Sequence, residues 1–93
     1  MKVISSIAEM QKWSAEERKV GHTVGFVPTM GALHQGHAEL FTRSVAAHPR
    51  TVVSIFVNPL QFNSETDLKA YPRQLEKDIA IAEQQGVDVL FIP

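Results

Sequence analysis

Three compact apolar runs, each stopped by a proline or by Asn-Pro, are the feature that most constrains the fold of this chain. They cover Thr23–Val27, Thr51–Val57 and Val87–Ile92. Apolar and polar residues do not alternate cleanly within them, as they do in a strand that has one face in water. Strands covered on both faces are typical of parallel sheets. The pattern therefore predicts buried parallel strands.

Helical patterns separate these runs. A short extended start at Lys2–Ile4 leads to a first predicted helix from about Ile7 to Lys19. Ser6 and Glu9 have the spacing of a capping box, in which the hydroxyl accepts from the Glu9 amide while the Glu9 side chain reaches back. Gly21 stands where a C-terminal cap belongs.

Two further helices complete the pattern. One spans about Gly36 to Ala47, and the other has Pro72 at its first position and Gly86 at its end. The resulting order, β-α-β-α-β-α-β, indicates an α/β, Rossmann-like three-layer fold with a mostly parallel sheet and right-handed crossovers. The 93 residues contain no internal repeat and no domain linker.

Composition excludes several classes of function. The net charge of −1 gives no electrostatic basis for binding nucleic acid or an anionic membrane. No apolar stretch is long enough to span a bilayer, and the N-terminus lacks the apolar segment of a secretory signal. The absence of cysteine excludes disulfides and thiolate metal sites and fits a cytoplasmic protein.

Two loops follow predicted strands at their carboxyl ends, where open α/β sheets bind ligands. They are Pro28–Gln35 and Asn58–Asp67, and the second is too long for a plain connector. In the first loop, Gly31 allows a ligand to approach the backbone closely. The helix that follows is expected to offer free amides and the positive end of its dipole to an anion.

His34 and His37 stand three residues apart at the start of that helix, so they project from one side of it. Two imidazoles there can donate to phosphate oxygens and stabilise charge that develops at phosphorus. No lysine follows a glycine-rich turn, so the loop is not a Walker site. Half of a zinc site and a pair of capping histidines without function are the alternatives from the residues alone.

Longer motifs of this chain resemble those of a known family. His34-Gln35-Gly36-His37 resembles the HIGH motif of the nucleotidyltransferase superfamily. The segment Val27–His37, followed by Ser54–Phe62 and later by Asp67-Leu68 and Tyr71-Pro72-Arg73, resembles the pantothenate synthetase (pantoate–beta-alanine ligase) family. This resemblance covers essentially the whole chain.

The resemblance implies an ATP-dependent ligation in two steps. Pantoate attacks the α-phosphate of ATP to give pantoyl adenylate and pyrophosphate, and the β-alanine amine then displaces AMP to give pantothenate. His37 and His34 would be catalytic. Magnesium would accompany ATP, held largely by phosphates and water, with no metal ion bound by the protein itself. By position, the ATP-binding residues would be Met30, Gly31, Ala32, Leu33, His34, Gln35, Gly36 and His37.

The resemblance also implies a site for the other two substrates. Gln61 would hydrogen-bond pantoate and border the β-alanine site, since an amide both donates and accepts. Phe62 and Met30 would offer apolar surface to the geminal methyl groups of pantoate, and Asn58 would orient the loop.

The chain departs from this family in length. Family members continue past Pro93 through the rest of the domain into a C-terminal domain, and the later part carries a basic KMSKS-like loop. We therefore expect residues 1–93 to be the N-terminal part of a Rossmann-like nucleotide-binding domain, without the C-terminal domain and inactive by itself. An unpaired edge on the strand before the motif would favour self-association. The expected partners are small-molecule substrates and further copies of the chain in a homo-oligomer, without nucleic acid or membrane.

Two alternatives stay open. Another HIGH-motif nucleotidyltransferase would usually carry Gly-x-Phe-Asp-Pro before its histidine pair, whereas this chain reads Phe-Val-Pro-Thr-Met-Gly. A non-catalytic nucleotide-binding or oligomerisation module would not need the basic loop at all.

Overall fold

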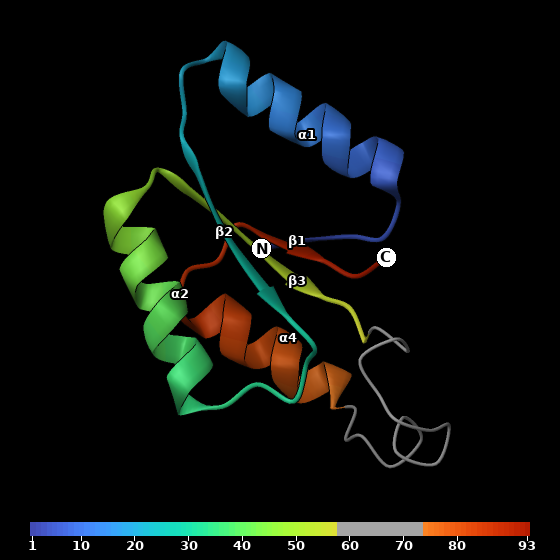
Figure 1. The fold of residues 1–93 in the computed structure, drawn as a ribbon, viewed down its shortest axis with the longest axis vertical. Helices are drawn as coiled ribbons and strands as arrows, with labels where there is room; N and C mark the ends of the chain where they lie inside the picture. Colours follow the sequence, from blue (N-terminus) through green and yellow to red (C-terminus); the bar gives the residue numbers. More distant parts are fainter. Residues whose placement is uncertain (58–73) are drawn as a thin grey trace.

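The computed structural model describes residues 1–57 and 74–93. In these residues strands and helices alternate, as the sequence predicts (Figure 1). The elements are β1 (Lys2–Ile4), α1 (Ile7–Lys19), β2 (Val24–Thr29), α2 (Gln35–Ala47), β3 (Arg50–Ile55), α4 (Leu75–Gln84) and β4 (Val89–Phe91).

The four strands of the described residues form one sheet in the order β1-β4-β3-β2, and every neighbouring pair is parallel. From β2 the chain moves one position at a time to β3 and then β4, and α2 and α4 lie against the same face. The step from β1 to β2 crosses the sheet in the opposite direction, and α1 packs on the other face. Crossovers of one hand place helices in this way. The predicted three-layer α/β fold is confirmed.

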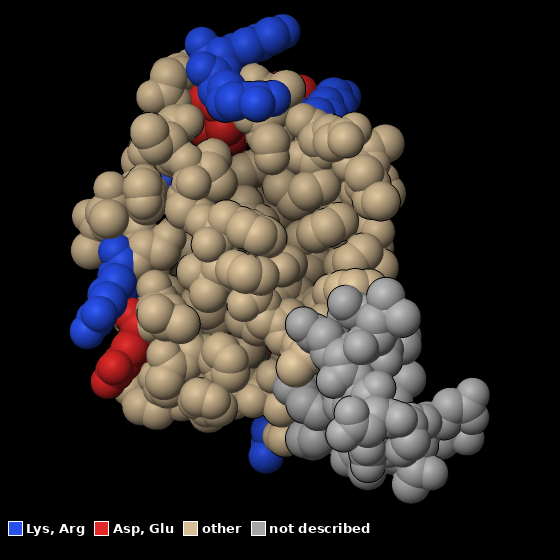
Figure 2. Space-filling view, viewed as in Figure 1, with Lys and Arg blue, Asp and Glu red and all other residues tan. Residues whose placement is uncertain are grey.

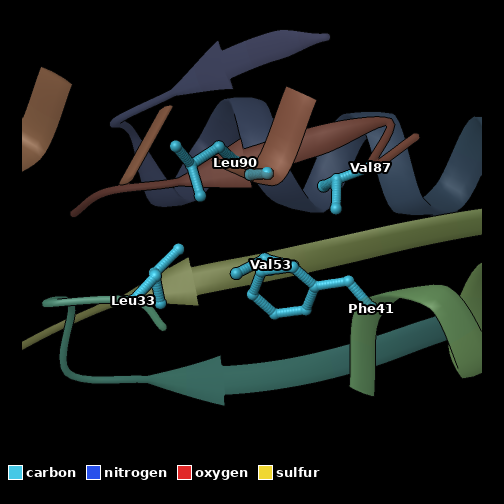
Figure 3. Packing of buried hydrophobic residues seen from close by; sticks show 6 residues of the cluster. Leu33, Phe41, Val53, Val87 and Leu90 are labelled. Carbon is cyan, nitrogen blue, oxygen red and sulfur yellow. The ribbon is translucent and has the colours of Figure 1, made fainter. Parts of the chain in front are cut away.

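The core explains why the apolar runs do not alternate. On β3, Val53 faces the α2 and α4 side whereas Val52 faces α1, and both are buried. Leu90 and Val89 divide in the same way on β4. Both faces of the central strands are therefore covered by helices, as parallel strands require. Figure 3 shows the cluster on the α2 and α4 side. Its labelled members are Leu33, Phe41, Val53, Val87 and Leu90.

Helix α1 has the predicted bounds. The Ser6 hydroxyl accepts from the Glu9 amide at 3.0 Å, and Gly21 adopts a φ of 81° just after the helix. The second half of the predicted capping box is not made, because the Glu9 carboxylate lies 3.4 Å from the Lys2 ammonium. No residue of α1 is fully buried.

Other element boundaries differ from the prediction. Strand β2 runs through Pro28 to Thr29, because it is the edge strand of the described sheet and a proline without an N–H can be accommodated there. Strand β3 ends at Ile55 and β4 at Phe91, earlier than predicted. Helix α4 begins at Leu75 after Gln74, so Pro72 is not its first residue.

The broad face seen in Figure 2 carries few charged side chains, and its Lys, Arg, Asp and Glu residues lie near the margins. Phe26, on the edge strand β2, is 60% exposed. No helix of the described residues is long and apolar enough to cross a membrane.

Candidate functional site

The segment between β2 and α2 lies at the carboxyl ends of the parallel strands, as predicted (Figure 1). Its turn is unusual, because Gly31 and Ala32 both have positive φ angles, of 85° and 51°. An alanine in the left-handed region costs about 1–3 kcal/mol and persists only where its surroundings hold it there. The neighbours of the turn therefore decide its shape.

Two side chains hold the turn from outside. The Thr29 hydroxyl donates to the Ser54 carbonyl at 2.9 Å and accepts from the Gly31 amide at 3.1 Å. The Asp78 carboxylate accepts from the amides of Ala32, at 3.1 Å, and Leu33, at 2.8 Å. Three successive backbone amides are thus satisfied by side-chain oxygens, which fixes the turn against β3 and α4.

The sequence prediction missed Asp78, which belongs to α4 and is only 2% exposed. One signal could have found it. Asp78 lies four residues before the buried Ala82, so it shares the buried face of α4. An ionisable residue on a buried helical face needs a partner, and the partner here is the loop that follows β2.

His34 and His37 are brought together, as predicted, with ring centroids 4.1 Å apart. His34 is the N-cap of α2, and its Nδ1 accepts from the Gly36 amide at 3.0 Å. In return, the His34 amide donates to Nδ1 of His37 at 3.2 Å. The two imidazoles form a reciprocal capping box, so the capping role that stood as an alternative to function is present.

Within the described residues, this arrangement uses Nδ1 of each ring and not Nε2. A ring nitrogen that accepts a hydrogen bond carries no proton, so both imidazoles are neutral with their protons on Nε2. Burial lowers the pKa of His37, the neighbouring His34 lowers it further, and the Asp78 carboxylate raises it in part. The pair therefore offers two neutral Nε2–H donors, suited to phosphate oxygens.

The prediction of free amides at the start of α2 is wrong for Gly36 and for the N-cap His34, and the amides of the two residues before them are occupied as well. The amides of His34 and Gly36 donate to the imidazoles, and those of Ala32 and Leu33 donate to Asp78. What α2 presents to an anion is therefore mainly the imidazole donors together with the helix dipole.

Within the described residues, a cavity of about 400 Å³ lies beside the turn. Met30 and Gly31 contribute to its wall, with Ile55 from β3 and Leu75 from α4. This volume falls in the range of about 300–1,000 Å³ that is usual for small-molecule sites. Asp78 also contributes to the wall, whereas His34 and His37 do not.

The structure leaves part of the predicted site outside its range. Asn58, Gln61 and Phe62 lie outside the described residues, and their roles stay predictions. In residues 1–57 and 74–93, no group of three or more His, Asp or Glu side chains could hold a metal ion.

Comparison with known proteins gives consistent matches. The sequence matches the family described as pantoate-beta-alanine ligase over residues 2–93. Pantothenate synthetase of Heliobacterium modesticaldum is 56% identical over 93 residues, which are all of this chain and 33% of that protein. Pantothenate synthetase of Staphylococcus haemolyticus is 51% identical over 92 residues, 99% of this chain and 32% of that protein. The chain thus spans about a third of the length of these relatives.

Solved structures show the same likeness. The pantoate-beta-alanine ligase of Francisella tularensis, complexed with beta-gamma ATP and beta-alanine, has a TM-score of 0.92 at 43% identity. That match covers all of this chain and 35% of that one. Pantothenate synthetase from Thermus thermophilus has a TM-score of 0.82 at 44% identity, and the match covers all of this chain and 32% of that one. With this fold, and with sequence similarity along its whole length, the chain belongs to the pantoate-beta-alanine ligase family.

Proposed function

We propose that this chain forms the nucleotide-binding part of an enzyme that uses ATP to ligate pantoate and β-alanine through a pantoyl adenylate. The observation that carries the proposal is the reciprocal capping box, which fixes two neutral imidazoles whose Nε2–H donors take no part in the cap. Family membership supports it, as does the relative from Francisella tularensis, which is complexed with beta-gamma ATP and beta-alanine.

In the first step of this reaction, a pantoate oxygen bonds to the α-phosphorus of ATP and pyrophosphate leaves. Negative charge grows on the phosphate oxygens in the transition state, and donors that are already positioned stabilise it without reorganising. His34 and His37 are assigned that role, and Met30 to Gly36 are assigned to ATP binding beside them. In the second step, the amine of β-alanine attacks the acyl carbon and AMP leaves.

Magnesium fits this assignment as a companion of the nucleotide. It is held in most such sites by phosphate oxygens and water, with few protein ligands, and it neutralises phosphate charge.

We assign the cavity beside the turn to pantoate. Met30, Ile55 and Leu75 give its wall an apolar character that suits the geminal methyl groups. Gln61, Asn58 and Phe62 are proposed to complete the pantoate and β-alanine sites from the part of the chain outside the described residues.

We also propose that the enzyme is a homo-oligomer in the cytoplasm. Its partners are small molecules, and it binds neither nucleic acid nor a membrane. Within the described residues β2 is the edge strand of the sheet and carries the exposed Phe26, and both features favour contact with another chain, which supports self-association. The absence of cysteine suits a reducing compartment.

An NMR titration with magnesium-ATP and then pantoate tests the function. We expect nucleotide to shift the signals of His34 and His37, and pantoate to shift those of Gln61. His37→Ala should weaken ATP binding at least tenfold. His48→Ala is the matched control, because His48 caps the other end of the same helix and its Nδ1 is hydrogen-bonded to the Thr23 hydroxyl at 3.2 Å. Equal affinity in the two variants would contradict the proposed role of the imidazole pair.

A further inference from the structure

Asp78 is a buried carboxylate that lies on the wall of the cavity assigned to pantoate but has no role in the reaction as proposed above. It is 2% exposed, and among residues 1–57 and 74–93 it makes no ion pair. Its stabilisation comes from the two backbone amides of Ala32 and Leu33, which lie 46 and 45 residues earlier in the chain. Hydrogen bonds to a buried charge are stronger than those between neutral groups, so this contact is well suited to fixing a loop.

The turn that Asp78 binds is one that would not hold its shape alone. Ala32 has a φ of 51°, a conformation that alanine rarely adopts. The fit is also tight, because a Cβ atom added at Gly31 would lie only 3.2 Å from Oδ2 of Asp78 and 3.2 Å from Cγ2 of Ile55. A carboxylate at this position therefore supports a strained backbone and limits its movement.

The turn leads directly into the imidazole pair. Leu33 donates its amide to Asp78 and buries its side chain in the core cluster, where Figure 3 shows it facing the sheet. The next residue, His34, is the N-cap of α2. The position of His34 and of its partner His37 is thus set by a turn that Asp78 holds on one side and the core on the other.

We propose that Asp78 is a positioning residue, which acts from α4 to hold the Gly31–Leu33 turn and so places His34 and His37 for the nucleotide. Its importance for ATP rests on the proposed function, whereas the hold on the turn does not. Asp78 also acts on His37 through charge. The groups that shift the pKa of His37 are its own burial, His34 and Asp78, and only the Asp78 carboxylate raises it.

Asp78→Asn tests this role, with Asp88→Asn as the matched control. The Asp88 carboxylate also accepts from a backbone amide, that of Thr51 at 2.7 Å, but it does so at the start of β3, at the opposite end of the strand from the turn. Three quantities are measured by NMR in each variant. They are the hydrogen exchange of the Ala32 and Leu33 amides, the pKa of His37 and the affinity for magnesium-ATP.

In Asp78→Asn we expect exchange at Ala32 and Leu33 to rise at least tenfold relative to the core amide of Val53. The amide side chain loses one acceptor and places an NH2 group against a backbone N–H. The pKa of His37 should fall, because the carboxylate that favours the imidazolium is gone. Nucleotide affinity should fall about tenfold. Asp88→Asn should change none of the three.

A second variant separates positioning from simple packing. Ala32→Gly removes the penalty of the left-handed conformation, so it should restore part of the ATP affinity lost in Asp78→Asn. A role of Asp78 in packing alone predicts no such rescue.

Unchanged exchange and an unchanged pKa of His37 in Asp78→Asn would overturn it. If Asp78→Asn does not fold, hydrogen exchange in the unmodified chain tests the proposal instead. The proposal then requires the amides of Ala32 and Leu33 to exchange nearly as slowly as that of Val53, and fast exchange at both would overturn it. If the unmodified chain ignores magnesium-ATP while Asp78→Asn still changes exchange and pKa, the positioning role holds and the proposed function fails.

Discussion

Two helices of this chain begin with side-chain caps at the same spacing, yet the caps use different chemistry. At α1 the Ser6 hydroxyl accepts from the Glu9 amide, and Glu9 itself turns to Lys2. At α2 both positions are histidine, and both rings cap the backbone. Serine is among the preferred N-caps and histidine is not. A capping box made of histidines therefore has a feature that a serine cap lacks, because each ring carries a second nitrogen, Nε2, that takes no part in the cap.

The two helices also differ in how deeply they are anchored. Phe41 of α2 is completely buried, whereas α1 buries no residue fully. Replacing Phe41 by alanine should cost about 3–5 kcal/mol of unfolding free energy, since the loss of a buried aromatic ring leaves a cavity. Trp13→Ala on α1, where the ring is partly exposed, should cost clearly less. Chemical denaturation measures both, and equal losses would show that the two faces of the sheet are equally anchored.

The box of α2 can be replaced by the residues of α1. In the double variant His34→Ser and His37→Glu, the helix keeps a capping box, so we expect its stability to stay within about 1 kcal/mol of the original. Affinity for ATP should fall at least tenfold, because both Nε2–H donors are lost and a carboxylate faces the phosphates. Calorimetry with magnesium-ATP measures the affinity. Retained affinity would mean that the cap, and not the imidazole donors, serves the nucleotide.

The cap of α1 is expected to contribute to stability alone. Ser6→Ala should cost about 1 kcal/mol, because one amide of the first turn loses its acceptor. ATP binding should not change, since Ser6 lies in the β1–α1 connection, and that connection is at the carboxyl end of β1, away from the β2–α2 turn in the sheet order. Thermal unfolding and the same calorimetric titration check the two parts, and a weaker affinity would connect α1 to the site.

The smallest expected effect is a difference in pH response. The pKa of His37 is lowered in the folded state, so between the folded and unfolded values the unfolded chain binds more protons. The stabilisation by neutral His37 is therefore complete above its ordinary value near 6.5 and is lost as the pH falls through the lowered one. Protection factors, which correct for the intrinsic pH dependence of exchange, should fall on acidification through this range more for amides at the start of α2 than at the start of α1, where the capping hydroxyl does not titrate. An equal fall at both helices would argue against protonation of the imidazole box.

Local rules account for what the sequence could predict. The bounds of α1 follow from Ser6 and Gly21, and the pairing of His34 with His37 follows from helical spacing. The parallel sheet follows from apolar runs that are buried on both faces, as Val52 and Val53 are. Each of these inferences needs only residues that are near one another in the chain or a pattern within one strand.

What the sequence could not predict depends on distant partners. The Asp78 carboxylate accepts from the amide of Ala32, 46 residues earlier in the chain. The position of Asp78 on the buried face of α4 indicates that it needs a partner, but no local pattern identifies that partner. Pro28 continues β2 because its strand lies at the edge of the described sheet, a property of the strand order and not of the proline. Two amides expected to be free at the start of α2, those of His34 and Gly36, are occupied because the imidazoles of the motif itself accept from them.

The position of β1 in the sheet affects the order in which the parts of this chain fold. Lys2 pairs with Val89, so the first of the described strands to be synthesised joins the sheet beside the last of them. Contacts so distant in sequence form slowly, because a long loop must close before they contribute. During synthesis the β2–α2–β3 unit, which contains the histidine pair, has its partners before β1 has any. We therefore expect the nucleotide motif to be ordered early, and β1 to be the last of the four described strands to gain protection.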